Sequence, residues 1–472
     1  MSENAERLAA LAALLQSGRL LTEADEMAPF LTDWRGRYDG RALAVVQPRE
    51  TAEVAHVVQF CAEHAIPLVP QGGNTGLCGG ATPDVSGEAL VLNLVRMNRV
   101  RDIDIDNNCI VVEAGCTLAS VQEAAADAGR YFPLSLASEG SCTIGGNIST
   151  NAGGVHVLRY GNMRDLVLGL EVVLPDGRLW HGLRALRKDN TGYDLKHLFI
   201  GAEGTLGVVT AAALKLFPRP SARATAWLAV PDPASAVRLL AMLRDACGDR
   251  VCAFEIISRV ALDLVLRHVP GARNPLPDDT CAWYVLAELS DGGDSPELAR
   301  MFERVLEQAL EASLTSDAVV AGNLSQLQAL WALRENISEA QRIEGVSIKH
   351  DVAVPVSRIP EFLERADSLL RARWPDIRIV AFGHIGDGNL HYNLSKDDAL
   401  DNAAFIGRTP EANRIVHDLI AELEGSISAE HGLGQLKREE ILRYKSGVEM
   451  DVMRALKSAL DLRQLMNPGK VL

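Results

Sequence analysis

The chain has 472 residues, more than a single domain usually holds, so we expect two or three domains. Its 47 Lys and Arg residues against 62 Asp and Glu residues give a net charge of −15, which argues against nucleic acid or an anionic membrane as a partner. No apolar run is long enough to form an integral membrane segment, and the acidic N-terminus resembles neither a secretory signal nor a transit peptide, so the sequence predicts a cytoplasmic protein.

Strand-like and helical segments alternate in the first half of the chain. Apolar runs at 42–46, 89–94 and 110–113 predict strands, Thr51 is expected to cap one helix, and a second helix is expected from Thr117. This alternation is typical of an α/β or α+β fold. Three Gly-rich segments interrupt it, at residues 71–76, 141–154 and 199–207.

The composition changes around the Pro-rich segment 217–221, which predicts a domain boundary. Beyond it, helical patterns cover 234–246, 296–313 and 324–344, and strand-like runs cover 283–288 and 377–382. The eight cysteines form no C-x-x-C pair and are expected to be buried free thiols.

The Gly-rich loops do not match the usual nucleotide-binding motifs. None is a G-x-G-x-x-G segment, and none ends in G-K-[ST], which argues against a Rossmann fold or an NTPase. Glycines that follow a strand still allow successive backbone N–H groups to converge on an anion. One such loop is usually only a turn. Three in one domain favour a long cofactor with a pyrophosphate.

The second half contains a compact group of metal-ligating residue types. His384 closes a strand, a Gly-Asp-Gly turn follows, and His391 and Asn393 share one face of the next strand. Glu430 and His431 add a carboxylate and an imidazole, but both can serve one site only if the chain bends there, for which Gly432 and Gly434 are suited. The alternative is that the two imidazoles are hydrogen-bonded interior histidines.

Two further segments are candidates for binding a carboxylate. Arg334 and Ser338 are four apart in an expected helix and would share one face, and Lys349 follows in an extended segment. Taken alone, these residues are better explained as a solvated helix face and a surface lysine.

Six segments, taken together and in order, resemble the FAD-dependent D-2-hydroxy-acid dehydrogenases of the vanillyl-alcohol-oxidase type. They are Pro70–Gly80, Thr143–Gly154, Asn190–Gly207, Gly383–Asn393, Glu430–Gly434 and Asn467–Lys470. The resemblance implies an α+β fold with a two-subdomain FAD-binding domain at 1–218, a substrate and metal-binding cap domain with sheet and helices at 219–440, and a C-terminal helical segment at 441–472 that returns to the FAD domain.

The resemblance also implies how the cofactor is held. Relatives with covalent flavin often have His where this chain has Asn74, so we expect non-covalent FAD. The implied FAD-binding residues are Pro70, Gln71, Gly72, Gly73, Asn74, Thr75, Gly76, Leu77, Ser141, Thr143, Gly145, Gly146, Asn147, Thr150, Asn151, Gly153, Gly154, Glu203, Gly204 and Asn467.

In the same family His384, His391 and Glu430 match the ligands of a divalent metal, usually Zn²⁺, although nitrogen and oxygen ligands also suit Mn²⁺, Co²⁺ or Fe²⁺. His431 then matches the general base beside the substrate hydroxyl. Arg334, Ser338, Lys349, Asn393 and His431 match the substrate-binding residues. The chain departs from many relatives at Ala202, Ser338 and Leu462, where they carry Ser, Thr and Pro.

The implied reaction is oxidation of a D-2-hydroxy dicarboxylate, D-2-hydroxyglutarate or D-malate, to the 2-oxo acid with hydride transfer to flavin N5. Electrons would pass to an electron-transfer flavoprotein or a quinone-linked carrier, and the family implies a homodimer. Three alternatives stay open at this point. They are a D-lactate dehydrogenase or glycolate oxidase subunit, a flavin-binding electron carrier with a structural metal, and a non-enzymatic metal-binding scaffold.

Overall fold

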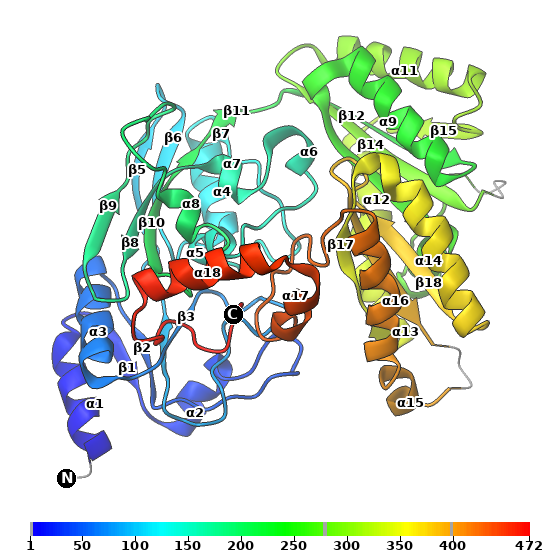
Figure 1. Ribbon diagram of the computed structural model, residues 1–472. Coiled ribbons are helices and arrows are strands. Elements are labelled where there is room, and N and C mark those ends of the chain that lie inside the picture. Colours follow the sequence, from blue (N-terminus) through cyan, green and yellow to red (C-terminus); the bar gives the residue numbers. More distant parts are fainter. Residues whose placement is uncertain (1–2, 277–280, 397–399) are drawn as a thin grey trace. The chain divides into compact units, whose positions relative to one another are not determined.

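The computed structural model describes residues 3–276, 281–396 and 400–472, with elements labelled as in Figure 1. The chain divides into two compact units. The first comprises Met1–Gly153, Gly161–Arg219 and Glu430–Leu472, and the second comprises Gly154–Tyr160 and Pro220–Ala429. By this division residues 430–440, which the sequence assigned to the cap domain, group with the first unit.

The first sheet of the first unit is mixed. Its strands run in the order β1 (Arg19–Leu21), β2 (Ala44–Gln47), β4 (Leu90–Asn93) and β3 (Leu68–Gln71). β4 is parallel to β2 and β3, which requires crossover connections, and β1 is antiparallel to β2. The helices α1 (Glu3–Leu14) and α3 (Thr51–His64) contribute apolar side chains to the core beneath this sheet. β3 therefore ends directly before the first Gly-rich loop.

The second sheet of the first unit is antiparallel. Its order is β5 (Val100–Asp104), β6 (Cys109–Glu113), β10 (Val208–Lys215), β8 (Val167–Val173) and β9 (Leu179–Gly182). Helix α4 (Leu118–Asp127) begins as the sequence predicts, because Thr117 accepts a hydrogen bond from the Ser120 N–H at 3.2 Å. Along the chain, the second Gly-rich segment precedes β8, and the third follows it and leads directly into β10.

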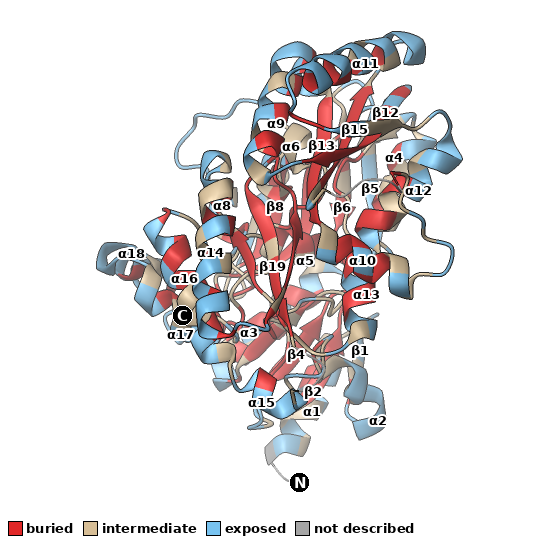
Figure 2. Ribbon diagram, turned by 90° about the vertical axis from the view of Figure 1, so that its right-hand side faces the viewer, coloured by how far each residue is buried: buried red, intermediate tan, exposed pale blue. Residues whose placement is uncertain are grey.

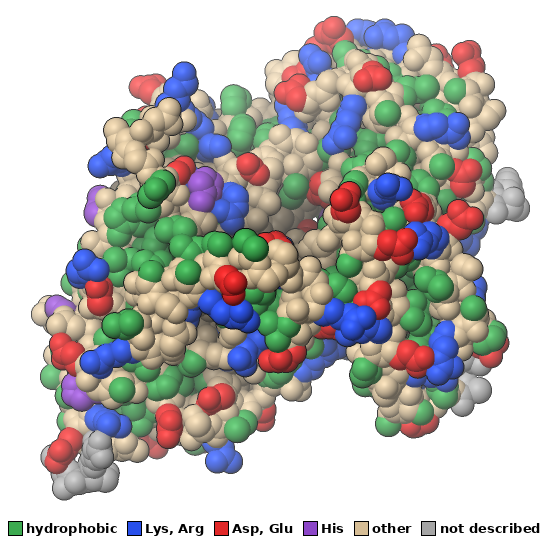
Figure 3. Space-filling view, in the orientation of Figure 1, with side chains coloured by type: hydrophobic (Ala, Val, Ile, Leu, Met, Phe, Trp, Pro, Cys, Tyr) green, Lys and Arg blue, Asp and Glu red, His purple; other side chains and the backbone are tan. Residues whose placement is uncertain are grey.

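Shorter elements complete the first unit. They are α2 (Ala24–Met27), η1 (Ala28–Phe30), β7 (Arg130–Tyr131), α5 (Ile144–Ser149), α7 (Met163–Leu166), α8 (Lys196–Phe199), β11 (Phe217–Pro218), α17 (Arg438–Tyr444) and α18 (Gly447–Leu460). The C-terminal segment is tied to this unit, since the Asn467 N–H donates to the Leu68 carbonyl at 2.7 Å. Hydrophobic side chains gather around α18 on the surface in Figure 3, and Val448 and Val452 on this helix are exposed.

The second unit is built on one antiparallel sheet. Its order is β15 (Asp317–Val320), β12 (Ala222–Val230), β14 (Trp283–Asp291), β13 (Val251–Ser258), β18 (Arg378–Gly383), β19 (Asn389–Ser395) and β16 (Ser347–Ile348), with β17 (Asp351–Ala353) also paired to β19. Its remaining elements are α6 (Val157–Tyr160), α9 (Pro233–Cys247), η2 (Gly248–Arg250), α10 (Arg259–His268), α11 (Ser295–Glu311), α12 (Leu324–Glu335), α13 (Ile337–Glu344), η3 (Val356–Arg358), α14 (Ile359–Arg373), α15 (Asn402–Ile406) and α16 (Thr409–Glu422).

The sheet of the second unit is buried beneath helices. Figure 2 shows the strands as buried and the outer faces of the helices as exposed. On one face, α10, α12 and α13 place apolar side chains against Trp227, Leu286 and Phe382. Every residue of β13 is buried, and one of them is a glutamate, Glu255. A charged residue in such a strand needs partners, because burying an unpaired charge is costly.

Most of the expected elements are present at or near their predicted bounds. The exceptions concern single residues. Thr51 is the first residue of α3 rather than its N-cap, and its hydroxyl donates to Glu171 at 2.7 Å instead. The helix expected at 324–344 is two helices, because Asn336 ends α12 and its side-chain amide donates to the Ala332 carbonyl at 2.8 Å. All eight cysteines are free thiols, and only Cys281 is not fully buried.

Candidate functional site

The hairpin β18–β19 brings two of the predicted metal ligands together in the second unit. His384 lies at the start of the turn and His391 on β19, and their ring centroids are 5.8 Å apart. The turn requires glycine, since Gly388 has φ +91° and a Cβ there would lie 2.2 Å from the Val354 carbonyl oxygen. The Gly-Asp-Gly sequence therefore sets the separation of the two imidazoles.

Glu255, which the sequence analysis missed, lies next to His384. Its Oε1 is 2.6 Å from His384 Nδ1, and its Oε2 accepts a hydrogen bond from Arg334 Nε at 2.7 Å. Burial alone would raise the pKa of Glu255, but the charges of His384 and Arg334 outweigh it and lower that pKa to about 2. Glu255 is therefore an ionised carboxylate that bridges two predicted site residues.

This contact determines how His384 can bind a metal. Histidines that ligate a metal usually donate their other ring N–H to a carboxylate or carbonyl, which fixes the tautomer and the ring orientation. With Nδ1 held by Glu255, Nε2 is the nitrogen suited to the metal. The donor set of His384 and His391 therefore fits a divalent ion such as Zn²⁺.

Arg334 is buried on α12, with its guanidinium 4.8 Å from the centre of the Phe382 ring. Its Nε is paired with Glu255, while its Nη2 is buried and has no hydrogen-bond partner among the described residues. An unpaired N–H of a buried guanidinium is costly unless a ligand accepts from it. This atom is therefore suited to a carboxylate oxygen of a bound molecule.

The other predicted substrate residues have different surroundings. Ser338 is exposed, and the interruption at Asn336 separates it from Arg334, so the expectation that both lie on one continuous helix is wrong. Lys349 is half-buried between β16 and β17. Asn393 uses its amide to donate to Gln341 Oε1 at 2.9 Å and to accept from the His350 N–H at 3.2 Å. A role for Asn393 in substrate binding stays a prediction.

A carboxylate that the sequence did not predict as part of the site, Asp351, lies near His391. Asp351 Oδ1 lies 3.8 Å from His391 Nδ1 and accepts a hydrogen bond from Asn389 Nδ2 at 2.9 Å. The Asp351 carbonyl in turn accepts from the Ala429 N–H at 3.3 Å. Ala429 is the last residue of the second unit, and Glu430 and His431 follow it directly in the chain.

In the first unit, Glu203 holds the segment that contains Glu430 and His431. Its carboxylate accepts hydrogen bonds from the Leu433 and Gly434 N–H groups at 2.7 and 2.8 Å. Gly432 has φ +73° and Gly434 has φ +50°, so the chain bends sharply directly after His431. Burial raises the pKa of Glu203, and the two N–H groups and Lys437 offset only part of this.

The predicted FAD loops are close together in the first unit. A Cβ on Gly73 would lie 1.9 Å from the Ser141 carbonyl oxygen, and one on Gly434 would lie 2.2 Å from the Cys78 carbonyl oxygen. At Gly76, in contrast, a Cβ would meet nothing within 4 Å. The first loop thus touches the second loop and the 430–434 segment and is open at Gly76.

Two buried oxygens in these loops have no partner among the described residues. They are Thr143 Oγ1 and Asn467 Oδ1, and both residues are predicted FAD ligands. Four of the predicted ligands also have the left-handed backbone conformation that non-glycine residues adopt rarely and mostly at functional sites: Asn74, Asn151, Glu203 and Asn467. These observations fit a large polar cofactor.

Several predicted FAD residues use their side chains to hold the loops in place. Gln71 Nε2 donates to the Phe30 and Ala81 carbonyls at 2.9 Å, and Asn74 Nδ2 donates to the Thr32 carbonyl at 2.8 Å. Asn151 Oδ1 accepts from the Arg164 N–H at 2.9 Å. Where the side chains are engaged in this way, the backbone of the loop is what remains to contact a cofactor.

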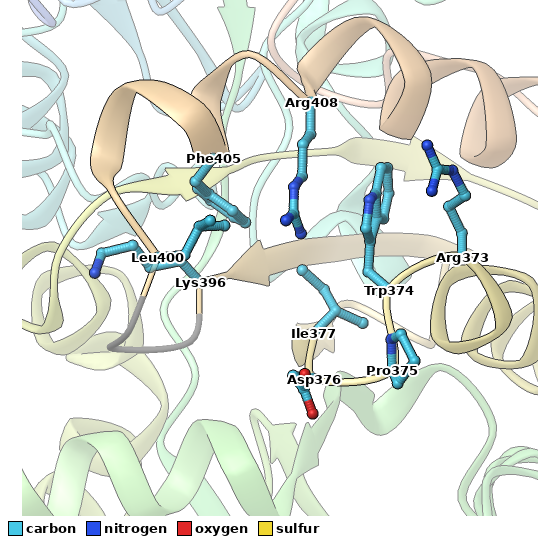
Figure 4. A pocket seen from close by; sticks show the side chains of 9 residues that line it. All are labelled: Arg373, Trp374, Pro375, Asp376, Ile377, Lys396, Leu400, Phe405 and Arg408. Atoms are coloured by element: carbon cyan, nitrogen blue, oxygen red, sulfur yellow. The ribbon is translucent and has the colours of Figure 1, made fainter.

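A hollow of about 260 Å³ lies elsewhere in the second unit (Figure 4). Trp374 lines it, with the guanidinium groups of Arg373 and Arg408 each 5.4 Å from its ring, together with Lys396 and Phe405. It opens beyond Ser395, at the end of β19 opposite the Gly-Asp-Gly turn, and none of the predicted site residues lines it.

Comparison with known families identifies the class. Residues 42–182 match the family described as "FAD binding domain", and residues 219–471 match "FAD linked oxidases, C-terminal domain". The second match covers more than half of the chain, and the chain therefore belongs to the FAD-linked oxidases.

Individual relatives narrow the family further. The chain is 37% identical over 470 residues to "Probable D-2-hydroxyglutarate dehydrogenase, mitochondrial" of rice (Oryza sativa subsp. japonica), covering 99% of this chain and 82% of that protein. It is 39% identical to "D-2-hydroxyglutarate dehydrogenase, mitochondrial" of Bos taurus, covering 96% and 81% of the two chains. It is also 39% identical to "D-2-hydroxyglutarate dehydrogenase" of Xanthomonas citri pv. viticola, covering 98% and 96%.

Solved structures show the same fold at low sequence identity. p-Cresol methylhydroxylase with substrate bound has a TM-score of 0.77 and 18% identity, covering 100% of this chain and 97% of that one. Alkyldihydroxyacetonephosphate synthase has a TM-score of 0.75 and 18% identity, covering 98% and 84%. The α+β fold of the vanillyl-alcohol-oxidase type is confirmed.

One expectation from the sequence is corrected by these relatives. The cytoplasmic location predicted from the N-terminus is overturned, because the rice and bovine relatives are named as mitochondrial proteins. Across the described ranges no helix combines the length and apolarity needed to cross a membrane.

Proposed function

We propose that this FAD-linked oxidase oxidises a D-2-hydroxy dicarboxylate, D-2-hydroxyglutarate before D-malate, to the corresponding 2-oxo acid. One observation from the structure supports it most strongly. In the second unit a single carboxylate, Glu255, contacts both His384 and Arg334. The imidazole is suited to a metal and the guanidinium to a carboxylate, and Glu255 holds both. This arrangement suits a substrate with a 2-hydroxy acid at one end and a second carboxylate at the other.

The chain's own residues account for binding and proton transfer. His384, His391 and Glu430 hold the divalent metal, and Arg334, with Lys349 as a second cation, binds the distal carboxylate. His431 accepts the proton of the C2 hydroxyl as general base. FAD, when bound, would supply a hydride acceptor, and the metal would supply a Lewis acid that makes the substrate hydroxyl more acidic.

The FAD site is proposed to be non-covalent. Asn74 is not a residue that forms a covalent bond to flavin, and its amide is already bonded to the Thr32 carbonyl. The Thr143 hydroxyl would donate to or accept from the cofactor and Asn467 Oδ1 would accept from it, because both oxygens lack other partners among the described residues.

A substrate panel tests the proposed function. Purified protein reconstituted with FAD and Zn²⁺ is mixed anaerobically with D-2-hydroxyglutarate, D-malate or D-lactate, with and without a chelator. We expect bleaching of the flavin band to be fastest with D-2-hydroxyglutarate and to be lost after chelation. Preference for D-lactate would instead favour a D-lactate dehydrogenase or glycolate oxidase subunit. No bleaching by any of the three would favour an electron carrier.

A substitution tests the metal assignment separately. His384→Ala should abolish metal-dependent turnover while the protein retains its yellow FAD. The control is His56→Ala, an exposed histidine of the first unit, which should change neither property. Full turnover by His384→Ala would remove His384 from the metal site. The electron acceptor and the homodimer expected from the family stay predictions.

A further inference from the structure

We infer that Glu255 is a positioning residue that serves the metal ligand His384 and the substrate-binding Arg334 at the same time. The inference rests on the proposed function and concerns a fully buried residue whose carboxylate contacts two proposed site residues. It assigns to Glu255 both the orientation of one imidazole and the placement of one guanidinium.

The geometry requires an acceptor on both sides. Glu255 Oε1 lies 2.6 Å from His384 Nδ1, and Oε2 lies 2.7 Å from Arg334 Nε. An arginine can only donate, and a histidine that ligates a metal through Nε2 carries its proton on Nδ1 and therefore also donates. Among side chains of this size, only an ionised carboxylate accepts along both edges.

The surroundings of Glu255 explain why no water can take its place. Its side chain is fully buried in β13, and the Leu286, Ile257 and Phe382 side chains belong to the apolar cluster on that face of the sheet. Arg334 lies on that face as well, with its guanidinium over the Phe382 ring. In an apolar environment a lost acceptor is not replaced by solvent, so removing this carboxylate removes the contact that it makes with each partner.

Glu288 provides a matched control on the neighbouring strand. Its carboxylate is equally buried and, since Glu255 pairs with Leu286 in β14, it lies on the same face of the sheet. It accepts from Thr225 Oγ1 at 2.8 Å and Trp331 Nε1 at 2.7 Å, so it contacts the same helix α12, and among the described residues it has no hydrogen bond to a histidine or an arginine. Replacing it tests for general damage to this face.

The glutamine variant separates the two roles. In Glu255→Gln the amide presents one accepting and one donating edge, so it can serve His384 or Arg334 but not both. If its oxygen faces Arg334, its NH₂ group forces the His384 proton onto Nε2, the nitrogen that the metal needs. If its oxygen faces His384, the NH₂ group opposes the Arg334 N–H.

The experiment measures two quantities on FAD-loaded protein. One is the Zn²⁺ dissociation constant, from competition with a chelator. The other is the ratio of kcat/KM for D-2-hydroxyglutarate to that for D-lactate at saturating Zn²⁺. Glu255→Gln should worsen at least one of them by about 10-fold or more, within the 10–100-fold range typical of residues that orient metal ligands. Glu255→Ala should worsen both, and Glu288→Gln should change neither by more than about twofold.

The outcomes divide cleanly. Wild-type values of both quantities in folded, yellow Glu255→Gln would overturn the inference, as would an equal loss in Glu288→Gln or the loss of only one quantity in Glu255→Ala. If Glu255→Ala does not fold, Glu255→Gln alone decides. Failure of the proposed function shows in the wild type, which would then bind no Zn²⁺ or not prefer the dicarboxylate, before any variant is compared.

Discussion

Two buried glutamates, one in each unit, support predicted site residues of their own unit and are held in opposite ways. Glu255 is held by a guanidinium and an imidazole, and its pKa is lowered to about 2. Glu203 is held by two peptide N–H groups, and burial raises its pKa. Partial charges of backbone dipoles do not offset the loss of water as full cationic charges do.

The difference indicates two kinds of support. Around His384, the second unit relies on side-chain charges that must all be present together. Around the 430–434 segment, the first unit relies on backbone geometry, with glycines at positive φ and carboxylate-to-amide hydrogen bonds. Substitutions should therefore have large, charge-dependent effects in the second unit and smaller, conformation-dependent effects in the first.

Removing Arg334 should have the largest effect. Arg334→Met leaves the fully buried Glu255 without its guanidinium partner, and breaking a buried ion pair typically costs about 3–5 kcal/mol. Urea unfolding followed by far-UV circular dichroism measures the loss. The same variant should lose far more activity on D-2-hydroxyglutarate than on D-lactate.

The control for this variant is Arg342→Met. Arg342 is exposed on α13 and paired with Glu339 on the same helix, so its removal should leave unfolding and substrate preference unchanged. Equal losses of activity on both substrates in Arg334→Met would remove Arg334 from distal-carboxylate binding. An unchanged unfolding curve would contradict the dependence of Glu255 on its partner.

The sequence predicts the proximity of His384 and His391 better than it predicts the carboxylate that holds His384. His384, Gly388 and His391 form a hairpin, so their proximity follows from neighbouring residues. Glu255 lies far from them in the chain, and its proximity to His384 depends on the pairing of β13 with β18. The signal that was present is a single acid in the apolar run 251–257, which is unusual for a buried strand.

Local rules also misjudged helix α12. Its pattern favours one helix over 324–344, but Asn336 competes for the backbone by bonding the Ala332 carbonyl, and α12 ends at Glu335. Conversely, the bend after His431 was predicted from Gly432 and Gly434 and is confirmed by their positive φ angles. The acceptor that holds this bend, Glu203, is 230 residues away from Leu433 in the chain, and the sequence predicted for it only a role in binding FAD.

A second prediction concerns a buried lysine in the first unit. Lys470 donates to the Pro468 carbonyl at 3.3 Å, and burial lowers its pKa to about 8, with Asp84 opposing and Arg438 adding to the shift. Between pH 10.5 and about 8 the unfolded chain therefore takes up this proton before the native protein does. The free energy of unfolding should therefore decrease by about 3 kcal/mol as the pH falls from 10.5 to about 8.

Lys470→Met tests this linkage. As the pH falls through this range, the unfolding free energy of the wild type should decrease relative to that of the variant. Below this range the difference between the two should be constant. A difference that is the same at pH 8 and pH 10.5 would show that Lys470 keeps an ordinary proton affinity in the native state, and that backbone contacts support a charge better than proposed here.

The third prediction separates charge from hydrogen bonding at Glu203. Glu203→Ala leaves the Leu433 and Gly434 N–H groups without their acceptor, which should destabilise this segment by about 1–3 kcal/mol. Glu203→Gln carries no charge and keeps one accepting oxygen, while its NH₂ group opposes the other N–H, so it should recover about half of this loss at most. Hydrogen exchange of peptides spanning 430–436 measures both. If the glutamine variant is as unstable as the alanine variant, the charge of Glu203 matters and the contrast with Glu255 weakens.

The smallest effect on stability is expected for a substitution at Gly76. This substitution tests whether the backbone of the first loop contacts FAD. A Cβ at Gly76 meets no protein atom within 4 Å, and its φ is not positive, so Gly76→Ala should leave unfolding within about 0.5 kcal/mol of wild type. The added methyl would enter the open side of the first loop, where FAD is proposed to lie, so the FAD dissociation constant should rise. The control is Gly447→Ala at the exposed start of α18, which also meets nothing within 4 Å and should leave FAD affinity unchanged. Equal FAD affinity in both variants, measured by fluorescence titration of the apoprotein, would mean that the open side of the first loop does not face the cofactor.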